Sequence, residues 1–111
     1  MRHYLFKKGD PQSEIYLASY KLWNVIWTET LQELDNIDRL HSDAYLNADY
    51  INVLTTDNDQ PIACHILNTN EVSPIYQNRK AFASYPNQAW ENLKKRGCTE
   101  FISYEWMCVH P

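Results

Sequence analysis

Hydrophobic residues between positions 15 and 34 recur at the spacing of an α-helix. Intervals of three or four residues place on one face Tyr16, Tyr20, Trp23, Trp27, Leu31 and Leu34, widened by Ile15, Leu22 and Ile26. Asp10 and Pro11 precede this face and suit the N-cap and the first helical position. The pattern predicts a long, aromatic, amphipathic helix that begins at Pro11.

Shorter runs with strand-like character lie on both sides of this helix. The first run ends at Gly9 and predicts a short strand at a sheet edge. Residues 50–56 and 61–67 are rich in strand-forming residues and flank the turn-forming residues 57–60, so they predict a hairpin. In the last run, residues 99–111, apolar side chains fall on both faces. This is typical of a central strand that is covered on both sides.

The remaining segments predict connections and a second helix. That helix begins at Pro86 and is closed by Gly97. Its inward side chains are expected to be Ala89, Trp90 and Leu93. Residues 68–84 are polar and predict a long loop, which makes them a candidate binding segment. Residues 35–43 are rich in acids and predict an irregular connection or a short helix.

In chain order these elements predict an α+β fold. It contains a mixed or antiparallel sheet of about four strands, a long aromatic N-terminal helix and a shorter second helix. The 111 residues suffice for a single domain, residues 1–111, with one hydrophobic core. A composition of 44% hydrophobic and 22% charged residues is typical of a globular chain.

The net charge and the hydropathy of the chain restrict the kinds of partner that it can bind. A net charge of −4 argues against nucleic acid, because backbone binding needs a field of the opposite sign. The basic run Lys94-Lys95-Arg96 falls in the last turn of the second predicted helix, where cations complement the helix dipole. The chain carries no apolar segment long enough for a membrane span or a signal peptide, so we expect a cytoplasmic protein.

Three cysteines, Cys64, Cys98 and Cys108, are an odd number without a Cys-x-x-Cys spacing. They predict reduced thiols, most of them in the core. Cys64 and Cys108 have histidines nearby, but the spacings match none of the usual zinc-binding pairs. The sequence therefore predicts no metal site.

Glu105 interrupts the apolar pattern of the last predicted strand. It shares a face with Phe101, Met107 and Val109. A carboxylate in such surroundings is paired, protonated or functional. Glu105 is therefore the first candidate catalytic residue.

The hairpin over residues 50–67 and the strand ending Glu105-Trp106-Met107-Cys108-Val109-His110-Pro111 resemble the first half of a GNAT-superfamily acyltransferase. In that family a central strand ends in a tripeptide similar to Val109-His110-Pro111. The aromatic N-terminal helix, the acids after it and the helix before the last strand are most similar to the acyl-homoserine-lactone synthase and N-acyl amino acid synthase branch.

The resemblance implies acyl transfer to a small-molecule amine. The co-substrate would be acyl-CoA, acetyl-CoA or an acyl-carrier thioester, without a metal. Glu105 would be the general base, and Val109 and Cys108 would bind the cofactor. Trp27, Asp38 and Asp43 would bind the acceptor substrate.

The chain also departs from the family pattern. The arginine that the lactone-synthase branch places soon after the strand glutamate is not found, since Trp106, Met107 and Cys108 follow Glu105. Only two glycines occur, and neither lies in a phosphate-binding loop. We therefore expect the natural chain to continue beyond its last residue, and this chain to represent the N-terminal half of the fold.

The sequence leaves a second class of function open. A small acidic protein-interaction module, of the inhibitor or immunity type and without catalytic activity, is the alternative. A strand that is apolar on both faces at the end of the chain also predicts a homodimer formed through that strand.

Overall fold

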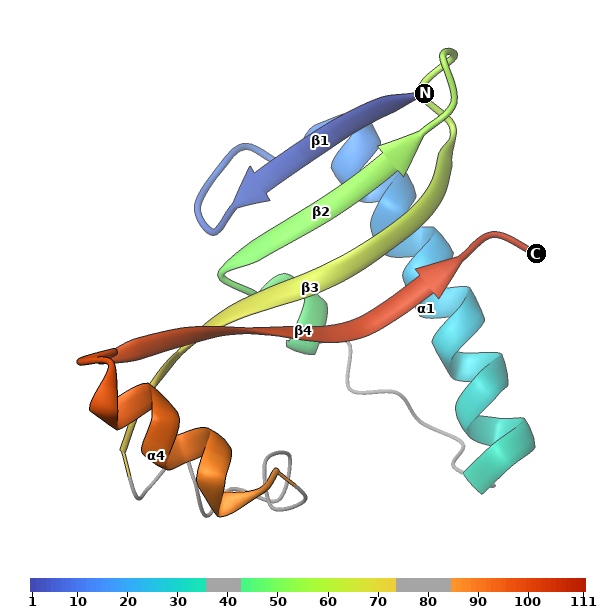
Figure 1. Ribbon diagram of the computed structural model, residues 1–111. Coiled ribbons are helices and arrows are strands. Elements are labelled where there is room, and N and C mark those ends of the chain that lie inside the picture. The colour runs from blue at the N-terminus through green and yellow to red at the C-terminus, as the bar shows by residue number, and fades with distance from the viewer. Residues whose placement is uncertain (36–42, 74–84) are drawn as a thin grey trace. The chain divides into compact units, whose positions relative to one another are not determined.

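The computed structural model describes residues 1–35, 43–73 and 85–111. In this part of the chain the fold is α+β, as expected (Figure 1). One antiparallel sheet has the order β1-β2-β3-β4, and three helices accompany it. The strands are β1 (Arg2–Lys7), β2 (Tyr50–Thr55), β3 (Pro61–Glu71) and β4 (Glu100–Val109). The helices are α1 (Glu14–Asp35), α2 (Asp43–Leu46) and α4 (Asn87–Lys95).

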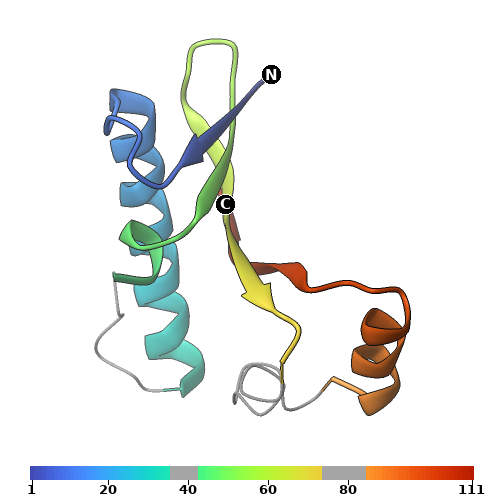
Figure 2. The same cartoon turned by 90° about the vertical axis from the view of Figure 1, so that its left-hand side faces the viewer.

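The described residues form two compact units. The first comprises Met1–Asn68 and Tyr104–Pro111, and the second comprises Thr69–Ser103. In the first unit α1 runs along one face of the strands (Figure 2). The core between them contains Tyr16, Trp23, Tyr45, Ala48, Ile51, Val53, Cys64, Ile66 and Cys108. Aromatic side chains of α1 therefore pack against the inward positions of β2, β3 and β4, as the stripe predicts. Leu34, at the end of the stripe, is an exception with 76% exposure.

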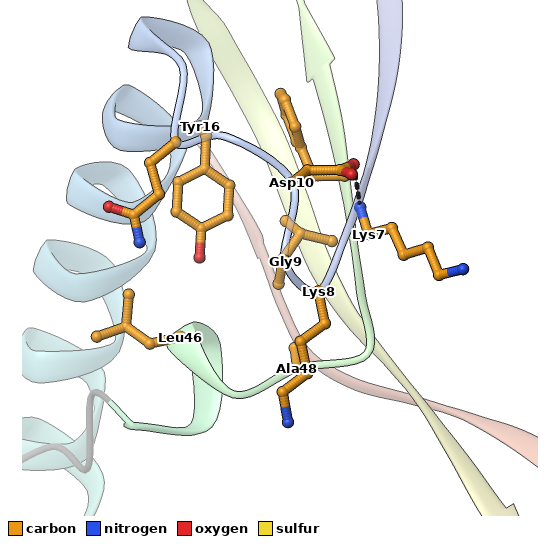
Figure 3. Close-up of a pocket in the computed structure, with 10 residues that line it drawn as sticks. Lys7, Lys8, Gly9, Asp10, Tyr16, Leu46 and Ala48 are labelled. Carbon is orange, nitrogen blue, oxygen red and sulfur yellow. Dashed lines mark hydrogen bonds between the residues drawn. The ribbon is translucent and has the colours of Figure 1, made fainter.

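The start of α1 differs from the prediction. Ser13, and not Asp10, caps the helix, because its hydroxyl accepts a hydrogen bond from the Tyr16 amide at 3.2 Å. The Asp10 carboxylate instead accepts the Lys7 amide at 2.8 Å and closes the turn after β1 (Figure 3). Gly9 supplies the positive φ of 92° that this turn uses. The helix consequently begins at Glu14, three residues after Pro11.

The predicted hairpin is present as β2 and β3. Ile51 opposes Ile66, and Val53 opposes Cys64 across the antiparallel pair. Strand β3 continues to Glu71, so the prediction of a loop from residue 68 is wrong for residues 68–71. Residues 74–84 of that predicted loop lie outside the described part of the chain.

The second unit contains α4 between the end of β3 and the start of β4. Trp90 is buried and its ring meets Phe101 edge-on at a centroid distance of 5.3 Å. The Asn70 amide donates to the Ser103 hydroxyl at 2.9 Å, and both side chains are buried. This hydrogen bond explains how the polar side chain of Asn70 can occupy a buried position of β3. Gly97 ends the helix with φ of 72°, as expected, whereas Ala89 is exposed and not inward.

β4 is not the covered central strand that the sequence predicts. In the observed order it is the outermost strand of the described sheet. Within the first unit, the Tyr104 ring meets the ring of His65 outside the core, whereas Cys108, four residues later in the same alternation, lies in the core. The strand therefore changes its inward face once, and apolar residues on both faces result from this change.

Among the helices of residues 1–35, 43–73 and 85–111, none combines the length and the apolar character that crossing a membrane requires.

Candidate functional site

Trp106 is the residue at which β4 changes its inward face. It has a positive φ of 53°, which is rare for a residue with a side chain. A left-handed residue together with a change of alternation is typical of a β-bulge. The bulge redirects the Trp106 ring toward α1, while Met107 and Val109 after it are exposed.

Two indole groups of α1 hold the bulge in place. The Nε1–H groups of Trp23 and Trp27 both donate to the Trp106 carbonyl oxygen, at 3.1 Å and 3.2 Å. Their rings meet the Trp106 ring edge-on at centroid distances of 6.0 Å and 4.9 Å. A left-handed non-glycine residue costs about 1–2 kcal/mol. Two hydrogen bonds at about 0.5–1.5 kcal/mol each, together with the ring contacts, offset this cost.

Glu105 lies directly before the bulge and is half-buried. The Asn68 side-chain amide donates to Glu105 Oε2 at 2.6 Å. The Asn68 Oδ1 atom in turn accepts the Asp49 backbone amide at 3.1 Å. Asn68 thus connects the residue before β2 to the carboxylate on β4. A side chain held in this way is oriented before any ligand arrives.

After the bulge, the backbone N–H and C=O groups of successive β4 residues point alternately to the two edges of the strand. The His110 amide donates to the Ile62 carbonyl of β3 at 2.7 Å. Because residues alternate in an antiparallel strand, the N–H and C=O of Met107 and Val109 point to the opposite edge. The described residues place no further strand at that edge. Cys108 instead faces the core, where its Sγ lies 3.3 Å from that of Cys64.

Predicted site residues that lie on β4 or contact it are Glu105, Cys108, Val109 and Trp27. Trp27 contacts Trp106, the neighbour of Glu105, and Val109 follows on the same strand. Asp38 lies outside the described residues. Asp43 is the first residue of α2, and its side chain also falls outside them.

Asn68, the residue that orients Glu105, was not among the predicted site residues. Asn68 follows an apolar run, which made it resemble the start of a loop, and no local pattern marks its contact with a residue 37 positions later. Trp23 belongs to the predicted helical stripe, but its hydrogen bond to β4 has no sequence signal either.

A second polar cluster crosses the sheet face that α1 leaves uncovered. His3 Nε2 and Asn52 Oδ1 are 2.7 Å apart, and Asn52 Nδ2 and His65 Nε2 are 3.0 Å apart. We call these three residues the His-Asn-His ladder. Burial and the nearby His3 lower the pKa of His65. A cavity of about 250 Å³ beside the ladder is lined mostly by apolar atoms and includes Leu54, Ala63 and Met107.

A second hollow lies at the turn after β1. It has a volume of about 130 Å³ and is lined by Lys8, Gly9, Tyr16, Leu46 and Ala48, among others (Figure 3). Burial raises the pKa of the Tyr16 hydroxyl, so this group stays neutral. Lys7 and Asp10 also line the hollow, and the Asp10 carboxylate already accepts the Lys7 backbone amide.

Residues 1–35, 43–73 and 85–111 contain no group of three or more His, Cys, Asp or Glu side chains that could hold a metal ion. The chain matches no family model, no curated protein and no solved structure. The oriented Glu105 carboxylate and the outer edge of β4 are the two features of this site that a ligand could use.

Proposed function

We propose that this chain provides the acceptor side of a GNAT-like N-acyltransferase, with Glu105 as the general base. The observation that supports this proposal is the oriented, half-buried carboxylate directly before the β4 bulge. The element order of strand, helices, hairpin, helix and strand is compatible with it.

In the proposed reaction Glu105 takes a proton from the ammonium group of a small-molecule acceptor. The resulting amine attacks the carbonyl carbon of a thioester that lies along the outer edge of β4. The C–N bond forms, the C–S bond breaks, and the thiol leaves with a proton. The outward N–H of Val109 donates to the thioester oxygen as negative charge develops there.

The test uses acetyl-pantetheine, a thioester that lacks the nucleotide part of CoA. In ¹⁵N NMR titration we expect saturable shifts of the Met107 and Val109 amides. With a primary amine added, mass spectrometry should detect the N-acetyl product. Glu105→Gln should retain the shifts and reduce product formation about 10²-fold or more, because the base is removed while the thioester contacts remain.

Glu100→Gln is the matched control, since Glu100 is an exposed carboxylate on the same strand. It should leave product formation unchanged. Acetyl-CoA should bind no more tightly than acetyl-pantetheine, because the sequence contains no glycine-rich phosphate loop. Absence of shifts at residues 107–109, or equal loss in the two glutamate variants, would overturn the proposal.

A second candidate function is protein interaction through β4. Three large side chains on the part of this strand in the first unit are exposed: Tyr104 by 72%, Met107 by 59% and Val109 by 63%. An outer strand with apolar side chains can pair with a strand of another chain. This observation favours the acidic interaction module, or self-association, as the alternative.

A further inference from the structure

Two of the three cysteines form a buried pair between neighbouring strands. Cys64 on β3 and Cys108 on β4 have their sulfur atoms 3.3 Å apart, and both residues are almost fully buried. The hydrogen bond from His110 to Ile62 lies two residues away on each strand, so the two cysteines oppose each other directly. Opposed residues at hydrogen-bonded positions have Cα atoms about 5.5 Å apart, within the range that a disulfide spans.

The surroundings make the two thiols unequal. Hydrogen bonding from Cys64 lowers the pKa of the Cys108 thiol. Hydrogen bonding with Cys108 and burial raise the pKa of the Cys64 thiol. The Ser19 carbonyl oxygen lies 3.8 Å from the Cys64 Sγ and is a second acceptor for its S–H when that hydrogen is not directed at Cys108. Cys108 is therefore the better nucleophile, and Cys64 retains its hydrogen.

We propose that Cys64 and Cys108 are a redox-active pair that hydrogen peroxide converts to a disulfide. The Cys108 thiolate attacks one peroxide oxygen, so an S–O bond forms, the O–O bond breaks, and hydroxide leaves. Cys64 then attacks the Cys108 sulfur, so the S–S bond forms, the S–O bond breaks, and the departing hydroxide takes the Cys64 proton. The hydroxide released in the first step takes up the proton that Cys108 lost on forming its thiolate. The two sulfurs together lose two electrons, and peroxide is reduced to two molecules of water.

The position of Cys108 provides access for a small oxidant. It is the last residue but one of β4, which ends at Val109 on the outer side of the described sheet. Strand ends open locally at lower free energy than the core. The disulfide would join β3 and β4 beyond the bulge and keep that end of β4 closed.

The experiment exposes the folded chain to hydrogen peroxide and counts thiols after quenching and denaturation. We expect the count to fall from three to one. Non-reducing peptide mapping should identify the Cys64–Cys108 cross-link. The Cys98→Ser variant, which retains the proposed pair, should form the same cross-link and lose both thiols. Oxidation should also move the urea midpoint upward.

Oxidation in denaturant is the matched control. In the unfolded chain Cys98 and Cys108 are close in sequence, whereas Cys64 and Cys108 are 44 residues apart, so the Cys98–Cys108 product should dominate. In the folded chain the Cys64–Cys108 product should dominate instead. The same mixture of pairings in both conditions would overturn the proposal. So would native oxidation that consumes Cys98 while Cys64 and Cys108 remain thiols.

Discussion

The side-chain amide of Asn52 determines which ring nitrogens of the His-Asn-His ladder carry a proton. Asn52 Oδ1 accepts from His3 Nε2–H, and Asn52 Nδ2 donates to His65 Nε2. An imidazolium has no acceptor nitrogen, so this arrangement requires a neutral His65. The ladder is therefore compatible with one charged histidine but not with two. The Tyr104 ring, 5.5 Å from the His65 ring, is the neighbour from β4.

Stability should fall on acidification because of His65. Its pKa in the folded chain lies below its ordinary value of 6.5, so the unfolded chain binds the proton more readily. This contribution is fully present above about pH 6.5 and is lost as the pH falls toward the folded pKa. Urea unfolding at about pH 7.5 and about pH 5.5 measures the difference. The His65→Gln variant should show a smaller pH dependence than the unmodified chain.

His110→Gln provides the comparison, because it removes an exposed imidazole outside the ladder. It should leave the pH dependence almost unchanged. If the two variants behave alike, the ladder does not couple protonation to folding.

At the scale of elements, β4 depends on its contacts with α1. The Trp106 carbonyl accepts the indole N–H groups of Trp23 and Trp27, so it keeps one donor when either tryptophan is replaced by phenylalanine. When both are replaced it loses both donors, and a buried acceptor without a partner is costly. The bulge should therefore tolerate one replacement far better than two.

We predict that Trp23→Phe and Trp27→Phe each destabilise the chain by about 1 kcal/mol through the lost hydrogen bond, with a further loss from the smaller ring. The double variant should lose more than the sum of the two. Urea unfolding of the four proteins gives this coupling as a double-mutant cycle. Strict additivity would mean that the two indoles do not share one acceptor in solution.

At the scale of the whole molecule, the exposed edge of β4 predicts self-association. Val109 is 63% exposed, and its backbone points to the outer edge of the strand. Val109→Lys should therefore weaken association by placing a charge on the edge while leaving the core intact. Trp106 on the same strand packs against Trp23 and Trp27. Trp106→Lys should instead destabilise the fold.

Sedimentation velocity over a range of concentrations measures this association. Leu5→Lys is the control, because Leu5 is a 56% exposed apolar residue on β1, the opposite edge strand of the described sheet. It should associate like the unmodified chain. A monomer at high concentration in the unmodified chain would contradict the prediction.

The sequence by itself determined the elements whose evidence is local. The stripe of α1, the hairpin of β2 and β3, and the proline and glycine at the ends of α4 all depend on residues a few positions apart. Hydrophobic period and turn chemistry are properties of such short windows. The burial of Cys64 and Cys108 was also predicted, and the structure confirms it.

Only the tertiary structure decided what β4 is and what surrounds Glu105. The side chains of a strand alternate between its two faces. One left-handed residue at Trp106 therefore moves the side chains that follow it to the opposite faces. From sequence, two half-strands with opposite phases resemble one strand that is apolar on both faces. The contacts of Asn68 with Glu105, and of two α1 indoles with the Trp106 carbonyl, join residues 37 to 83 positions apart. No local pattern specifies such contacts, because they form only when the chain has folded.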